Sequence, residues 1–138
     1  MPIGPRDLLD QSQRLLKGDT EVDHRAAVSR AYYCALHCCI LLCRKHPDGF
    51  SIVGSSSHEE AIAKLIAWPT QKPFGSVRKQ CVALGISLRK GKKLRVRADY
   101  SLNSTIELSK AKQHVSNMGL IKVQADKVMQ SLTGASKS

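Results

Sequence analysis

Apolar side chains recur every three or four positions along the last third of the chain, which is the spacing of one face of an α-helix. The stripe consists of Leu108, Ala111, Val115, Met118, Ile121, Ala125, Val128 and Leu132. A seam of this kind is stable only when other helices cover it. No segment shows sustained two-residue alternation with turn signals, so a β-sheet is not expected. The sequence therefore predicts an all-α protein.

Helix start and stop signals divide the rest of the chain into further helices. Pro5 is typical of a first helical turn, and Thr20 precedes two acidic residues that favour a helix N-terminus. Ser57 and Ser104 each open a Ser-x-x-Glu capping box. The predicted helices run from residue 5 to Gly18, from Thr20 to about His46, and over 57–66, 77–91 and 104–132. Gly85 and Gly91 weaken the fourth of these helices.

With 138 residues, the chain has the length of one domain. We expect a single bundle of four or five helices over residues 1–132 and a flexible tail over 133–138. The first residues lack the apolar segment of a secretory signal. The longest apolar run, residues 35–43, is too short to span a bilayer. A cytoplasmic protein with no membrane partner is therefore expected.

Positive charge is concentrated in one segment. The chain has 22 Lys and Arg against 11 Asp and Glu, a formal net charge of +11. Residues 78–97 contain no acidic residue. Their basic residues are Arg78, Lys79, Arg89, Lys90, Lys92, Lys93, Arg95 and Arg97. Such a concentration favours a polyanionic partner, with a merely basic, soluble surface as the alternative.

Four of the five cysteines lie close together, at positions 34, 38, 39 and 43. On one helix they point to nearly opposite sides, so they cannot form a tetrahedral zinc site. We interpret them as small buried packing residues. No metal site and no cofactor are predicted.

Two motifs carry a family resemblance. Residues 29–37 read SRAYYCALH, residues 95–100 read RVRADY, and Ser57-His58 opens a short helix between them. This order resembles the HEPN superfamily, in particular the branch with an SRAYYA helix and an R-x-x-ADY motif. The resemblance implies a helical bundle that forms two-fold dimers. It also implies either a metal-independent ribonuclease of toxin–antitoxin or phage-defence systems, or a non-catalytic nucleic-acid-binding module.

In catalytic members an Arg that holds the scissile phosphate is followed four to six residues later by a His. The register fits Arg95, but Tyr100 stands where that His is expected. The implied catalytic candidates are therefore Arg95, Tyr100 and Asp99. Because the pKa of a free tyrosine lies near 10, Tyr100 is a poor base at pH 7. Either His37 or His58 is a possible acid/base in its place.

The candidate RNA contacts are Arg30, Tyr33, Lys92, Lys93 and Arg97. Structural alternatives stand beside these roles. Arg95 and Asp99 have the i, i+4 spacing of an ion pair, and Arg30 has Asp99 as a possible partner across the bundle. Tyr33 suits a core or interface position, His37 a hydrogen-bonded core position, and His58 a helix cap.

The expected function is RNA binding through a basic cleft, with or without metal-independent cleavage. The alternative is a non-catalytic subunit that docks an acidic protein, such as an antitoxin or a larger defence protein.

Overall fold

The protein, seen in a computed structural model that describes residues 3–50 and 57–137, is built from helices, and no strand occurs in these two segments. The elements are α1 (Pro5–Leu15), α2 (Glu21–Cys43), α3 (Ser57–Ile66), the short 3-10 helix η2 (Phe74–Val77), α4 (Arg78–Tyr100) and α5 (Leu108–Lys137). The all-α bundle predicted from the sequence is confirmed.

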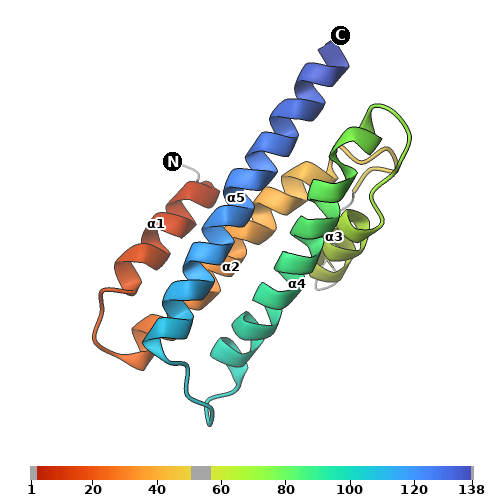
Figure 1. Ribbon diagram of the computed structural model, residues 1–138. Coiled ribbons are helices and arrows are strands. Elements are labelled where there is room, and N and C mark those ends of the chain that lie inside the picture. The colour runs from red at the N-terminus through yellow and green to blue at the C-terminus, as the bar shows by residue number, and fades with distance from the viewer. Residues whose placement is uncertain (1–2, 51–56, 138) are drawn as a thin grey trace.

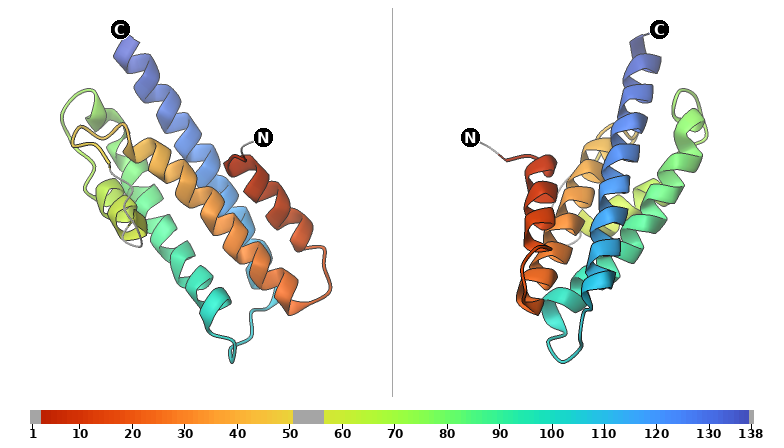
Figure 2. Two further views of the ribbon diagram at one scale, coloured as in Figure 1. Left: turned by 180° about the vertical axis from the view of Figure 1, so that it is seen from behind. Right: turned by 60° about the vertical axis from the view of Figure 1, so that its left-hand side comes forward.

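Helices α1, α2, α4 and α5 form the bundle, and α3 is added at one side. In Figure 1, α1 and α4 run down while α2 and α5 run up, with α1 and α4 on opposite sides of the α2–α5 pair. The short α3 lies beside α4, away from α1, in both views of Figure 2. The C-terminal turns of α5 extend beyond the other helices (Figure 1). Helix α3 therefore packs against α4 and also contacts α2.

The central element is α2, which begins where the sequence predicted. The Thr20 hydroxyl accepts a hydrogen bond from the Asp23 backbone N–H at 3.2 Å, which caps the helix. By length and composition, α2 is the one described helix that could cross a membrane, but 67% of its apolar window is buried inside the bundle. The core helix of a bundle meets the same criteria.

All five cysteines are buried and free, which confirms their interpretation as packing residues. Burial raises the pKa of the Cys43 and Cys81 thiols to about 12, so both stay protonated at pH 7. Trp68 is buried at 1% exposure, and its Nε1 donates to the Phe74 carbonyl at 3.1 Å.

The predicted end of the fourth helix at residue 91 is wrong, because α4 continues to Tyr100. Both glycines serve packing rather than termination. A Cβ at Gly85 would lie 2.8 Å from Cγ1 of Ile66, so the missing side chain lets α3 approach α4. A Cβ at Gly91 would lie 2.6 Å from Cε of Met118 on α5. The R-x-x-ADY motif therefore forms the last turns of α4.

Ser57 and Ile66 are the ends of α3, as predicted. Most of the expected loop before α3, residues 51–56, lies outside the described residues. The capping box at Ser104 is wrong, because α5 begins only at Leu108 and the Ser104 hydroxyl donates to the Ser101 carbonyl at 2.9 Å. The predicted stripe of α5 is buried from residue 111 to residue 132. The helix continues past Leu132 to Lys137.

Candidate functional site

The two sequence motifs meet at Arg95, on the face of α4 that packs against α2. The side chain of Arg95 is only 9% exposed. Its guanidinium carbon lies 5.4 Å from the ring centroid of Tyr32, 5.6 Å from that of Tyr33 and 5.9 Å from that of Tyr100. Aromatic faces at such distances attract a cation, more strongly where water is excluded. We call these four residues, together with His58 and Asp99, the Arg95 cluster.

The ion pair predicted between Arg95 and Asp99 is present, with Nη1 of Arg95 3.3 Å from Oδ2 of Asp99. The same carboxylate oxygen accepts a hydrogen bond from the Ser29 hydroxyl at 3.4 Å. The alternative pairing of Arg30 with Asp99 is wrong, since Arg30 is exposed and makes no ion pair among the residues described. One polar atom of the site, Nε of Arg95, is buried without a hydrogen-bond partner.

Helix α3 brings an imidazole into the cluster. Nδ1 of His58 lies 2.9 Å from the Tyr32 hydroxyl, and the two rings stack with centroids 5.6 Å apart. His58 also meets the edge of Tyr33, at 5.9 Å between centroids. Each of these two tyrosines therefore touches both Arg95 and His58, which holds a guanidinium and an imidazole around one aromatic pair.

Burial and neighbouring charges keep the His58 imidazole and the Tyr32 hydroxyl neutral at pH 7. Partial burial, followed by the positive charges of Arg95 and Lys92, lowers the pKa of His58 below its ordinary value. Burial raises the pKa of Tyr32, so its hydroxyl stays protonated. A neutral imidazole can accept a proton, which is the property required of a general base.

The remaining candidate residues divide into paired and free cations. Lys92 forms an ion pair with Glu59 at the start of α3. Arg97 donates to the Ser104 hydroxyl and to the Thr105 carbonyl, so it holds the loop after α4. Lys93 is exposed and has no hydrogen bond or ion pair within the described part of the chain.

Of the two histidines considered as a substitute base, only His58 lies in the cluster. The alternative of a buried, hydrogen-bonded His37 is wrong: this side chain is exposed on α2. His58 contacts the Tyr32 hydroxyl through Nδ1, and its role as a helix cap stays a prediction. Tyr100 is 72% exposed, the most exposed ring around Arg95.

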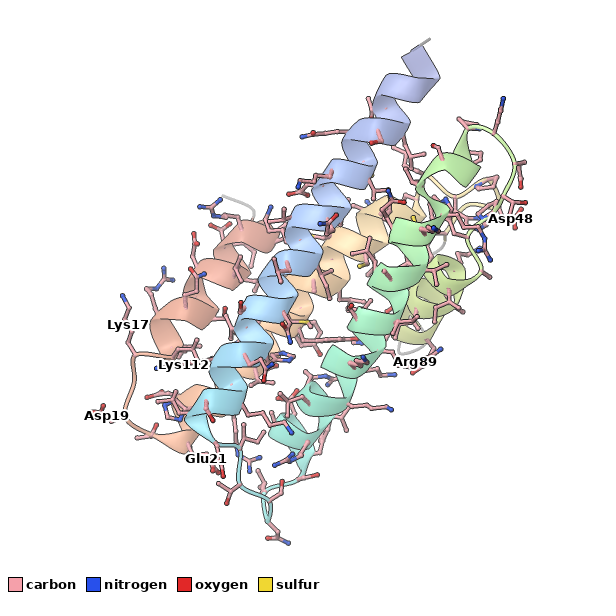
Figure 3. All side chains as sticks on the ribbon, in the orientation of Figure 1. Lys17, Asp19, Glu21, Asp48, Arg89 and Lys112 are labelled. Carbon is pink, nitrogen blue, oxygen red and sulfur yellow. The ribbon has the colours of Figure 1, made fainter. Side chains whose placement is uncertain are left out.

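Two buried polar residues were missed by the sequence reasoning. Arg25 donates to the carbonyls of Ala98 (2.9 Å) and Ser101 (3.2 Å) and pairs with Glu21 at 3.1 Å. Glu21, labelled in Figure 3 near the α4–α5 loop, also accepts from the Ile106 backbone N–H at 3.2 Å. The i, i+4 spacing of Glu21 and Arg25 was the available signal. These bonds fix the end of α4 next to the cluster.

The second missed residue is His114, in the middle of the α5 stripe. It is 5% exposed, and its Nε2 lies 3.0 Å from the Val28 carbonyl on α2. Burial lowers the pKa of His114 to about 4, although the contact with Val28 raises it. Its place in an apolar stripe of period 3–4 was the only signal in the sequence.

Among the described residues, no group of three or more His, Cys, Asp and Glu side chains is arranged to hold a metal ion. Comparison of the chain with protein-family models, with curated proteins and with solved structures found no match. The HEPN resemblance therefore rests on the sequence motifs alone.

Proposed function

We propose that the protein binds RNA through the outer face of α4, next to the Arg95 cluster. The observation that carries this proposal is the excess of unpaired cations on one helix. Helix α4 has eight basic residues and one acid. Four of the eight are exposed and have no hydrogen bond or ion pair in the described part of the chain, namely Lys79, Arg89, Lys90 and Lys93.

Two of these cations border the cluster. Positions 89, 93, 96 and 100 follow at three- and four-residue spacing, so they share one face of α4. We call Arg89, Lys93, Val96 and Tyr100 the outer face of α4. Arg89 is labelled in Figure 3, on the part of α4 that lies beside α3. The face combines free positive charge with an exposed aromatic ring, which suits phosphates and unpaired bases respectively.

Arg95 has a positioning role in this proposal. Its guanidinium is almost covered in the single chain and is paired with Asp99, so the first phosphate contacts belong to Arg89, Lys93 and the exposed Arg30 of α2. Arg95 holds the rings of Tyr33 and Tyr100 at the edge of that surface. A two-fold dimer, which the resemblance implies, would bring a second copy of this surface into the same particle.

The test is RNA affinity as a function of salt. Three neutralised phosphates predict a loss of affinity of about 20- to 40-fold between 50 and 200 mM salt. The double change Arg89→Glu with Lys93→Glu should weaken binding at least tenfold. The matched control, Arg14→Glu with Lys127→Glu, makes the same change of net charge on exposed residues of α1 and α5. Equal losses in both variants, or no RNA binding at 50 mM salt, would overturn the proposal.

Metal-independent RNA cleavage is a second candidate, favoured by the imidazole in the cluster. His58 would take the proton of a ribose 2′-hydroxyl, whose oxygen attacks the adjacent phosphorus. The bond to the 5′-oxygen then breaks, leaving a 2′,3′-cyclic phosphate and, after protonation, a 5′-hydroxyl. The expected activity resists EDTA and is lost in His58→Gln, whereas His24→Gln, on the first turn of α2, retains it. Cleavage that survives His58→Gln would exclude this site.

A further inference from the structure

A groove lies between α4 and α5, on a different side of α4 from the Arg95 cluster. It encloses about 600 Å³ and is lined by residues of these two helices only. None of the cluster residues lines it. In the right-hand view of Figure 2, the two helices separate toward the C-terminal end of α5.

The dimensions of the groove match one helix. Its lining residues extend from Gln80 to Leu94 on α4 and from Lys110 to Gln124 on α5. Each span is about four helical turns, or roughly 20 Å, the length of a helix of about 14 residues. The apolar lining consists of Ala83, Leu84, Leu94, Met118, Leu120 and Ile121. Leu120 is 59% exposed, so apolar surface remains uncovered in the single chain.

The charged residues that line the groove indicate the charge of its partner. Lys90 and Lys110 line the groove, one from each helix, and no carboxylate lines it. The third titratable group there, His114, is neutral at pH 7 because burial lowers its pKa to about 4. An apolar floor between two lysines is complementary to an amphipathic helix with acidic flanks.

We propose that this groove binds an acidic amphipathic helix of another protein. A second copy of the chain fits this groove poorly, because a two-fold contact there would face Lys90 and Lys110 with the same two lysines. RNA fits poorly as well, because no Phe, Tyr or Trp side chain lines the groove to stack a base. The proposal is independent of RNA binding at the outer face of α4.

The probe is a labelled 14-residue helical peptide with leucines on one face and glutamates on its flanks, measured by fluorescence anisotropy at 150 mM salt. Ala83→Trp fills the groove from an exposed position and should weaken binding at least tenfold. Ala63→Trp, an exposed alanine of α3 away from the groove, is the matched control and should bind as the unaltered protein does. A scrambled peptide of equal charge, without an apolar face, should bind at least tenfold more weakly.

Charge reversal gives a second test. The double change Lys90→Glu with Lys110→Glu should reverse the charge preference of the groove. The variant should bind a peptide with lysines in place of the glutamates more tightly than it binds the acidic peptide. The proposal is overturned if the acidic peptide does not bind, if the scrambled peptide binds equally, or if the two tryptophan variants behave alike. It is also overturned if Ala83→Trp abolishes RNA binding, because the groove would then be the RNA site.

Discussion

The Tyr32 hydroxyl and Nδ1 of His58 lie 2.9 Å apart, although 26 positions separate the two residues in the chain. This contact joins α2 to the start of α3 beneath the guanidinium of Arg95. It gives the SRAYY motif a physical role, since Tyr32 is fully buried and fixes an imidazole beside a cation. The position of the His58 imidazole in the cluster therefore depends in part on the Tyr32 hydroxyl, beside the ring contacts of His58 with Tyr32 and Tyr33.

Tyr32→Phe tests that dependence. The ring remains to pack against Arg95, but a part-buried nitrogen of His58 loses its partner, which should lower the free energy of unfolding by about 1 kcal/mol. Urea denaturation at pH 7 measures the loss, and the His58 imidazole resonances should shift. Tyr33→Phe is the control, because the Tyr33 hydroxyl makes no hydrogen bond among the described residues. Equal destabilisation of the two variants would contradict the assigned role.

Gly85 and Gly91 should respond differently to alanine. In an exposed helix, Gly→Ala stabilises by about 1 kcal/mol. At Gly85 the new Cβ would also meet Leu65 Cβ at 3.0 Å and the Ile62 carbonyl at 3.2 Å, so α3 must move. Gly85→Ala should destabilise by about 1–2 kcal/mol in thermal or urea unfolding.

The matched comparison is Gly91→Ala, whose Cβ meets only the flexible end of Met118 and, at 3.5 Å, the edge of His114. Because Met118 can change rotamer, this variant should have nearly the stability of the unaltered protein. Displacement of α3 by Gly85→Ala should also shift the His58 resonances, because His58 is on α3. If Gly85→Ala is as stable as Gly91→Ala and leaves these resonances unchanged, the close contact of α3 with α4 does not position His58.

Arg25 should be among the most costly charged residues to remove, because it is buried and hydrogen-bonded. Arg25→Met keeps the apolar stem but leaves the carbonyls of Ala98 and Ser101 without their donor. We expect a loss of about 3 kcal/mol and faster hydrogen exchange in the last turn of α4. Arg6→Met, which breaks an exposed pair with Asp10, should cost less than 0.5 kcal/mol, on the order of surface ion pairs. Unchanged hydrogen exchange at the end of α4 would contradict the proposed role of Arg25 in fixing that end.

The sequence was sufficient for the elements whose signals are local. Thr20 and Pro5 act within one turn of their helices, and the α5 stripe repeats at a period set by the helix itself. The end of α4 was not predictable in this way. Gly85 and Gly91 resemble helix breakers until α3 and α5 are in place, when each accommodates a neighbouring side chain.

The site shows the same division. The ion pair of Arg95 with Asp99 follows from i, i+4 spacing within one helix. The position of His58 does not, because it depends on how α3 packs against α4. The motifs also did not indicate that the Arg95 side chain is buried, because the three tyrosine rings around its guanidinium come from two different helices. The free cations that support RNA binding became identifiable only after their paired neighbours were known.

His114 gives a prediction for pH. The pKa of His114 is about 4 in the folded protein because the side chain is buried, and near 6.5 in the unfolded chain. The unfolded state therefore binds the proton first as pH falls, and the stabilisation present above pH 6.5 is lost progressively toward pH 4. Between pH 7 and pH 5 this residue alone should cost about 2 kcal/mol. His58 and His46, whose pKa values are also lowered by burial, act in the same direction.

His114→Gln should remove its share of this dependence while keeping an amide that can donate to the Val28 carbonyl. Urea unfolding at pH 7 and pH 5 should show a smaller difference in the variant than in the unaltered protein, by about 2 kcal/mol. His37→Gln serves as the control, because that side chain is exposed and its loss should leave the difference unchanged. Identical pH dependence in the His114 variant and the unaltered protein would mean that His114 is protonated with an ordinary pKa, and hence that the α2–α5 interface admits water at this position.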